Sequence, residues 1–255
     1  MTRLAIGLTV FSLSLACSAA AYGQTTMRLN NVLMVNVLDP KSDVDVNALE
    51  TQALDRIAAA QPPGMRIHLV RKDRGNRPGR FMIVGLASGA PEVAALQHAI
   101  HQSVPADFVN SGGRDVEYRL VGAERLGTLP EVDVLGIHYI RVRPDRVEAF
   151  DRFVAERLHP IAGTLSPDLR LIYYKPVRGD EPGNYITVFA LTKASREKYW
   201  PGGKDADALR TTFQPAHAVR DELQTYLVDD SFATGNLIAA VFESRQWADW
   251  VIVTK

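Results

Sequence analysis

The feature that most constrains the fold is an internal repeat. Residues 65–88 and residues 169–192 align without a gap, at an offset of 104 positions. Six of the aligned pairs are identical: Arg66 and Arg170, Arg74 and Arg178, Gly75 and Gly179, Pro78 and Pro182, Gly79 and Gly183, and Val84 and Val188. We therefore expect two copies of one structural unit, each burying its apolar surface against the other.

The hydrophobic pattern of each copy predicts the element order β-α-β-β-α-β. Strands are expected where β-branched residues cluster between turns, and helices where apolar residues recur every three or four positions. The helical stripe is clearest in the second copy, at Val147, Phe150, Val154, Leu158 and Ile161. Pro160 is expected to weaken the end of that helix. The expected strands include 32–38, 65–71, 80–87, 116–121, 134–142 and 250–254, and the second helix of each copy is expected over 91–102 and over 205–227, the latter interrupted by Pro215.

This element order is that of the split βαβ, or ferredoxin-like, unit. Residues 136–150, GIHYIRVRPDRVEAF, look like the strand-then-helix opening of the dimeric α+β barrel superfamily. That superfamily includes antibiotic-biosynthesis monooxygenase-like, haem-degrading and chlorite-dismutase-like proteins, and the chain resembles it in fused form. The resemblance implies an α+β fold of two tandem ferredoxin-like units, residues 24–126 and 127–255, whose antiparallel sheets pack as an α+β barrel. It carries no catalytic signature over to this chain.

The first 23 residues have the pattern of a signal peptide. Arg3 gives a positive start, residues 4–16 are uncharged, and residues 21–23 have small side chains at the positions that a cut requires. The uncharged run is too short to span a bilayer comfortably. The alternative is a lipid anchor at Cys17, whose preceding residues partly match a lipobox. Both routes predict a periplasmic or secreted protein without a membrane-spanning segment.

Charge and cysteine content exclude several classes of function. The 29 basic and 29 acidic side chains are balanced and scattered, so nucleic-acid binding is not expected. Cys17 is the only cysteine, so cleavage after residue 23 leaves no disulfide and no thiolate metal site. No other metal site is expected, because His98 and His101 lie one helical turn apart without an evident third ligand.

The space between the two sheets is the expected ligand site. His138 lies on the strand face that carries Ile140, and Asn36 occupies the same position in the first copy. We expect both polar residues to line that space, with His138 as a catalytic base or a ligand. The alternative for His138 is a histidine hydrogen-bonded within or beside the sheet. His68, whose counterpart is Ile172, is expected to be buried in packing.

The second copy also carries an insertion over 195–204 that the first copy lacks. Its Tyr199 and Trp200 precede Pro-Gly-Gly, which suggests a hinged loop that caps the barrel and contacts the ligand. The alternative is a surface excursion pinned by Trp200. Arg220 lies close to the apolar stripe of a later helix, where it either meets an anionic ligand or pairs with an acid such as Asp151.

Three functions remain open at this point. The first is an exported protein that binds a small, largely apolar molecule between its sheets. The second is a monooxygenase-like enzyme that acts on a small aromatic or polyketide-like substrate, either without a cofactor or with haem. The third is an envelope protein-interaction module. The expected assembly is a monomer with an internal pseudo-dimer, or a homodimer.

Overall fold

The computed structural model describes residues 32–75, 79–87, 89–110, 114–121, 132–165, 168–203, 207–228 and 247–253. The expected signal segment and Cys17 lie outside these residues. The strands are β1 (Val32–Leu38), β2 (Arg66–Gly75), β3 (Phe81–Ala87), β4 (Arg114–Leu120), β5 (Val134–Arg141), β6 (Leu169–Arg178), β7 (Asn184–Leu191) and β8 (Trp247–Val253). The α-helices are α1 (Val46–Ala60), α2 (Ala90–Ser103), α3 (Val147–Phe153), α4 (His159–Leu165), α5 (Lys193–Tyr199), α6 (Asp207–Phe213) and α7 (Arg220–Gln224).

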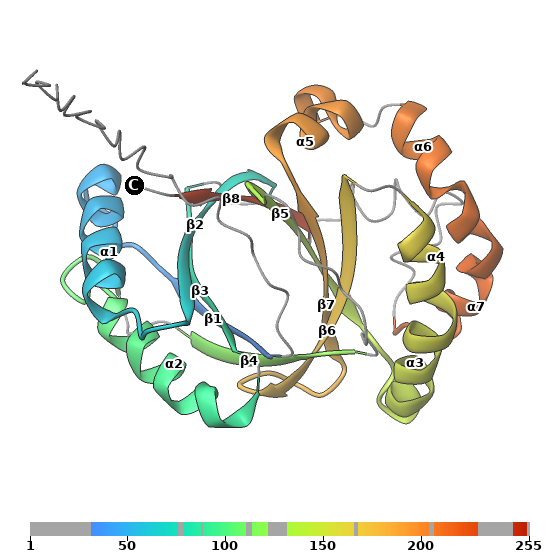
Figure 1. Cartoon of the computed structure of the whole chain (residues 1–255), viewed down its shortest axis with the longest axis horizontal. Helices are drawn as coiled ribbons and strands as arrows, with labels where there is room; N and C mark the ends of the chain where they lie inside the picture. Colours follow the sequence, from blue (N-terminus) through green and yellow to red (C-terminus); the bar gives the residue numbers. More distant parts are fainter. Residues whose placement is uncertain are drawn as a thin grey trace, which may run out of the picture.

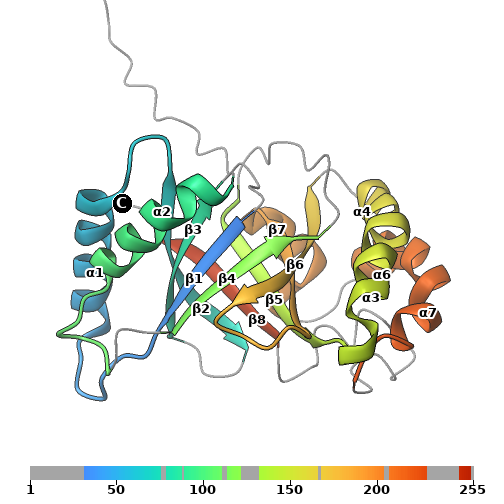
Figure 2. The ribbon, with the colours of Figure 1, turned by 90° about the horizontal axis from the view of Figure 1, so that it is seen from below.

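The eight strands form one closed antiparallel barrel in the order β1-β3-β2-β8-β5-β7-β6-β4 (Figure 2). Within the first half the order is β4-β1-β3-β2, and within the second half it is β8-β5-β7-β6. The halves join at two seams, where β2 pairs with β8 and β4 pairs with β6. The expected α+β barrel is confirmed. It is one continuous sheet, so none of these strands leaves an unpaired edge.

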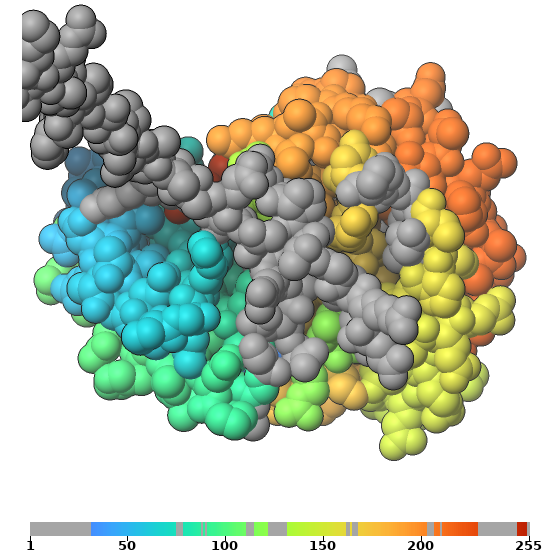
Figure 3. Space-filling model, in the orientation of Figure 1, coloured from blue at the N-terminus to red at the C-terminus, as the bar shows by residue number. Residues whose placement is uncertain are grey.

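The helices cover the outer surface of the barrel on two opposite sides (Figures 1 and 3). Helices α1 and α2 lie against the first half, and α3 to α7 lie against the second half (Figure 1). The buried apolar side chains accordingly form three clusters: one inside the barrel, one beneath α1 and α2, and one beneath the helices of the second half. None of the helices within the described ranges has the length and apolar character needed to cross a bilayer.

The strands beneath the helices, such as β5 and β7, are therefore buried on both of their faces. On β5, Leu135 and Ile137 belong to the cluster inside the barrel, whereas Val134 and Ile140 belong to the cluster beneath the helices. Both sets are apolar, which is typical of strands that are covered on both sides. The inner and the outer face of such a strand are both apolar. They differ in what covers them, which is the barrel interior on one face and the helices on the other.

Two prolines shape the helices of the second half. Pro160 does not end its helix: the chain widens into the π-helical turn η2 (Val154–Leu158), in which the His159 N–H donates to the Val154 carbonyl, and then continues as α4. A proline has no N–H to donate and its ring crowds the carbonyl four residues earlier, which accounts for a widened turn just before it. Pro215 similarly opens the 3-10 turn η4 (Gln214–Val219) between α6 and α7.

Candidate functional site

A row of buried polar side chains crosses three neighbouring strands of the second half. His138 on β5 pairs in register with Thr187 on β7, which in turn pairs with Tyr173 on β6. Their side chains are almost fully buried, with 1%, 4% and 6% of their surface exposed. Cross-strand neighbours on one sheet face lie close enough for their side chains to interact. The row therefore brings an imidazole, a hydroxyl and a phenol together beneath the helices.

Tyr173 is held as a protonated phenol in this environment. Burial raises the pKa of Tyr173 above its ordinary value, and the hydrogen bond from the Thr187 hydroxyl opposes that rise. A second imidazole approaches from the helix side, because the ring of His159 on α4 lies 6.1 Å from the Tyr173 ring, centroid to centroid. The His159 Nε2 atom is itself buried. The layer between sheet and helices thus holds two imidazoles and a phenol that can donate its proton.

The first half shows that the fold does not require this row. The equivalent register pairs are Asn36 with Ile83 and Ile83 with Leu69, so two of the three positions are aliphatic there. Asn36 is fully buried, and its side-chain amide donates to Asp115 at 2.7 Å. A fold that accepts isoleucine and leucine has no structural need for Thr187 and Tyr173. We interpret the polar row as a feature of the second half alone.

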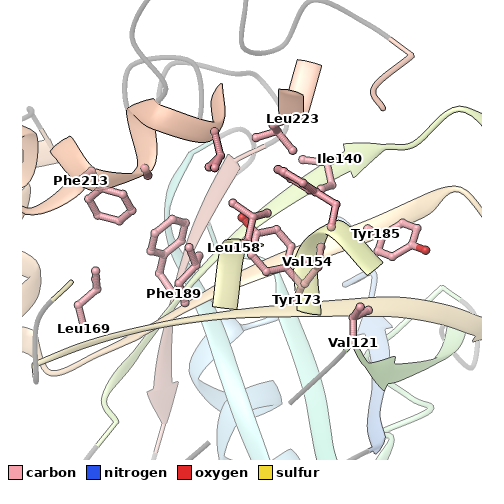
Figure 4. Close-up of a cluster of buried hydrophobic side chains, with 14 of the residues drawn as sticks. Val121, Ile140, Val154, Leu158, Leu169, Tyr173, Tyr185, Phe189, Phe213 and Leu223 are labelled. Carbon is pink, nitrogen blue, oxygen red and sulfur yellow. The ribbon is translucent and has the colours of Figure 1, made fainter. Parts of the chain in front are cut away.

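Aromatic rings lie near Tyr173 in the apolar cluster of this layer (Figure 4). Phe150 on α3 contacts Tyr173 and Tyr185 edge to face, with ring centroids 6.4 and 4.9 Å away. Phe189 on β7 contacts Phe213, at a centroid distance of 5.8 Å. Edge-to-face and tilted arrangements are the favourable geometries for aromatic pairs. The surroundings of Tyr173 are therefore apolar and rich in aromatic rings.

One ion pair fixes α3 against the sheet beside this layer. The Tyr185 hydroxyl donates to Asp151 at 2.7 Å, and the Lys175 ammonium group pairs with the same carboxylate. Burial raises the pKa of Tyr185, and its hydrogen bond to Asp151 raises that pKa further. Asp151 is thus engaged by Lys175 and Tyr185, and the expected pair between Asp151 and Arg220 does not form.

His138 and Asn36 do not line the interior of the barrel. Both lie on the outer face of the sheet, because they alternate with the interior residues of β5 and β1. Asn36 and His138 occupy equivalent positions in the two halves, as expected. The sheet face on which they lie, however, points toward the helices. The position proposed for His138 between two sheets was therefore wrong, although the residue is buried at a site that carries other polar groups.

The segment expected as a lid is a clamp between the two halves. Arg196 on α5 pairs with Asp73 on β2 at 2.7 Å and with Asp249 on β8 at 3.2 Å. Glu197 pairs with Arg74 on β2 at 2.7 Å. The pairs with Asp73 and Arg74 cross the β2–β8 seam and tie the insertion to the first half. Lys204, the last residue of the expected insertion, lies outside the described residues.

Tyr199 and Trp200 pack inward from this clamp. Only 0% and 3% of their surfaces are exposed, and both belong to the cluster beneath the helices. The Tyr199 hydroxyl donates to Asp168, and the Trp200 ring contacts Phe189 at 6.1 Å. Both rings therefore border the layer that holds the polar row. Arg220 is half-buried, and it pairs with its neighbour Asp221 at 2.9 Å.

Sequence reasoning did not assign three residues of this layer to the site: Thr187, Tyr173 and His159. The internal repeat contained a signal for two of them, because Thr187 aligns with Ile83 and Tyr173 aligns with Leu69 at the offset of 104. A hydroxyl-bearing side chain at a strand position where the other copy has an aliphatic one indicates that the side chain does more than fill the core. His159 carried no such signal, since its position depends on the turn before Pro160.

Sequence comparisons do not place the chain in a family, because neither a family model nor a curated protein matches it. Solved structures do match. A candidate monooxygenase from Lactobacillus acidophilus NCFM superposes with a TM-score of 0.53 at 8% identity, over 87% of this chain and 92% of that one. The chain has the dimeric α+β barrel fold. A candidate monooxygenase from Fusobacterium nucleatum (TM-score 0.50, 10% identity, 89% and 94% coverage) and a candidate chlorite dismutase (0.52, 11%, 88% and 94%) share the dimeric α+β barrel.

Haem is a cofactor that the resemblance to this superfamily implies, and the donor set of the layer fits it. His138 and His159 both bring imidazole nitrogens into the layer, and imidazole is a common axial ligand of haem iron. One of these two histidines would hold the iron in this dimeric α+β barrel. A bound haem would supply electron-transfer and oxygen chemistry.

Proposed function

We propose that this chain binds a small aromatic molecule between the sheet and the helices of its second half, and oxygenates it. The observation that carries the proposal is the row formed by His138, Thr187 and Tyr173, buried among aromatic rings and absent from the first half. Buried polar groups that the fold does not require, in an apolar surrounding, are the pattern of a ligand site. The monooxygenase-like solved structures with the same fold support this class of reaction.

The residues of the row can begin such a reaction without a cofactor. His138 is the proposed base, which removes a proton from a phenol, an enol or an activated CH2 group of the substrate. Tyr173 accepts from Thr187 and keeps its own proton, so it can donate a hydrogen bond to the oxyanion that forms. The electron-rich anion then reacts with molecular oxygen. For an activated CH2 group the balance is CH2 + O2 giving C=O and H2O.

Oxygen uptake with dithranol, a hydroxyanthrone with an activated CH2 group, tests this proposal. We expect His138→Ala to lower kcat/KM by about 100-fold or more, the typical contribution of a general base. Tyr173→Phe removes only the hydroxyl and is expected to lower kcat. His98→Ala is the matched control, because His98 is exposed on α2. Unchanged turnover in His138→Ala would contradict the assignment of the base.

A haemin titration tests the haem alternative in the same variants. A Soret band that His138→Ala or His159→Ala weakens, while His98→Ala does not, would assign the imidazoles to iron instead of to proton removal. Oxygen uptake by the haem-free protein that depends on His138 would favour the cofactor-independent reaction.

The finer organisation of the chain belongs to the same proposal. We propose that residues 24–126 and 127–255 are tandem ferredoxin-like units, which the repeat and the matching strand orders of the two halves support. We also propose that residues 1–23 direct export to the periplasm and are then removed. Mass spectrometry of protein recovered from the bacterial periplasm tests this: a mature chain that begins at Gln24 is expected, and a lipid-modified Cys17 would indicate the other route.

A further inference from the structure

A buried carboxylate beneath α5 uses only part of its hydrogen-bonding capacity. The Asp249 side chain is 2% exposed, and its Oδ2 atom accepts from Arg196 at 3.2 Å. Its Oδ1 atom is buried and has no hydrogen-bond partner among the described residues. The same Arg196 nitrogen donates to Asp73 at 2.7 Å, so Asp249 has the longer of two shared bonds. An unsatisfied buried carboxylate oxygen destabilises the fold, because it loses its hydration without a replacement bond.

The other seam of the barrel holds its carboxylate differently. Glu117 on β4 is the counterpart of Asp249, since both lie on the last strand of their half at matching register positions. Its carboxylate pairs with Arg178 at 3.3 Å, and 14% of its side chain is exposed. Arg74, the repeat partner of Arg178, instead bonds Glu197 on α5. The carboxylate at the β4–β6 seam therefore reaches solvent, whereas the one at the β2–β8 seam is covered where α5 lies.

The surroundings of Asp249 leave two ways to relieve this burial. The charged and titratable groups that face it come from α5, β2 and β5: Arg196 and Glu197, Asp73 and Arg74, and His138 two residues beyond its register partner Gly136. Burial raises the pKa of Asp249 to about 6 in spite of the two arginines. At acid pH a proton neutralises the carboxylate. At neutral pH hydration is the remaining route, and water reaches the carboxylate when α5 moves away.

The helix α5 is a short cover over one side of the layer that holds the polar row. It has seven residues, and its ion pairs to β2 and β8 hold one flank. On the other flank Lys198 and Tyr199 bond Asp168, which precedes β6. Tyr199 and Trp200 extend inward into the apolar cluster that also contains Tyr173. Movement of α5 would therefore expose both the buried carboxylate and one side of this layer.

We propose that α5 is a pH-sensitive gate, which moves away from the sheet more often at neutral pH, where Asp249 is ionised, than at mildly acidic pH. The carboxylate is hydrated in the open form, so its pKa there is the ordinary 3.8, against about 6 in the closed form. The stability that Asp249 gives to the closed form is fully present below pH 3.8 and is lost as the pH rises through about 6. Opening should therefore become about tenfold more frequent between pH 5 and pH 7. That the gate admits a substrate rests on the proposed function, whereas its opening does not.

Residue-resolved hydrogen exchange of the whole chain at pH 5 and pH 7 tests the inference. The reporter is the Trp200 backbone N–H, which donates to the Arg196 carbonyl at 2.7 Å and becomes exposed when α5 moves. After correction for the intrinsic exchange rate, its protection should fall about tenfold from pH 5 to pH 7. Amides of β3 are the internal reference for unfolding of the whole barrel, because this strand is buried along its length.

Two matched substitutions identify the group responsible. Asp249→Asn keeps an oxygen for Arg196 but cannot ionise, so it should abolish the fall in protection at Trp200. Glu117→Gln makes the same change at the other seam and should leave the fall intact. The inference is overturned by equal protection of Trp200 at both pH values, by protection equal to that of β3, or by an unchanged fall in Asp249→Asn. These readouts need no substrate, so an intact gate in a protein that consumes no oxygen would refute the proposed function alone.

Discussion

The buried carboxyl group of Asp249 gives the sharpest prediction about stability. Its side chain is 2% exposed, beneath α5, and its partner is Arg196 at 3.2 Å. Burial raises the pKa of Asp249 to about 6, although Arg196 and Arg74 act to lower it, and the charge of Asp73 adds slightly to the rise. The carboxylate is therefore less stable in the folded protein than in the unfolded chain. We predict that the change in unfolding free energy caused by Asp249→Asn is more favourable at neutral pH than at acid pH.

The size and pH window of this effect follow from the two pKa values. An unfolded Asp loses its proton near 3.8, whereas the folded carboxyl group keeps its proton up to about 6. The stability that this carboxyl group contributes is fully present below pH 3.8, and it is lost as the pH rises through about 6. A rise from 3.8 to about 6 corresponds to about 3 kcal/mol. The difference in unfolding free energy between Asp249→Asn and the original chain should therefore grow by up to that amount between pH 4 and pH 7.

Urea unfolding at a series of pH values measures this difference directly. Asp73→Asn is the control, because Asp73 pairs with the same arginine but is 41% exposed. Its difference from the original chain should rise much less toward neutral pH, because the charge of Asp73 adds only slightly to the pKa of Asp249. Parallel stability profiles for Asp249→Asn and the original chain would refute the reasoning, since they would mean that the carboxyl group titrates alike in both states.

Two further substitutions test the architecture. Gly79 and Gly179 both have φ of 83°, but a Cβ atom at Gly79 would meet nothing within 4 Å, whereas at Gly179 it would collide with the Asp115 carbonyl oxygen. Gly79→Ala should therefore cost about 1–2 kcal/mol in a urea titration, and Gly179→Ala clearly more; equal losses would show that the β6–β7 turn does not press on β4. Phe150→Ala should cost about 3–5 kcal/mol, because the buried ring contacts Tyr173, Tyr185 and Tyr226. A loss below about 1 kcal/mol would mean that α3 is loosely packed.

The local pattern of the sequence predicted the elements well. The first strand was expected over 32–38 and is found over Val32–Leu38, and the helix expected over 91–102 is Ala90–Ser103. Strand and helix periodicities are properties of short segments, so they can be read without tertiary information. The break expected at Pro215 is also present as the turn η4.

The orientation of the strand faces could not be predicted in the same way. Alternation correctly grouped His138 with Ile140, but it does not tell which face is inside when both faces are apolar. The two seams were equally hidden, because the pairing of β2 with β8 and of β4 with β6 joins segments that are distant in the sequence. The insertion around Arg196 was misread for this reason, since its partner Asp73 lies across the β2–β8 seam.

Both halves of the barrel belong to one polypeptide, so a residue can be substituted in one half without the same substitution in the other. When two identical subunits close a barrel, every substitution appears twice, and a lysine that faces the interior confronts its own copy. Here Lys72 is opposed by a strand that carries Pro176 at the matching place, and Thr187 has Ile83 as its counterpart. Covalent linkage lets evolution specialise one wall while its twin keeps the barrel closed.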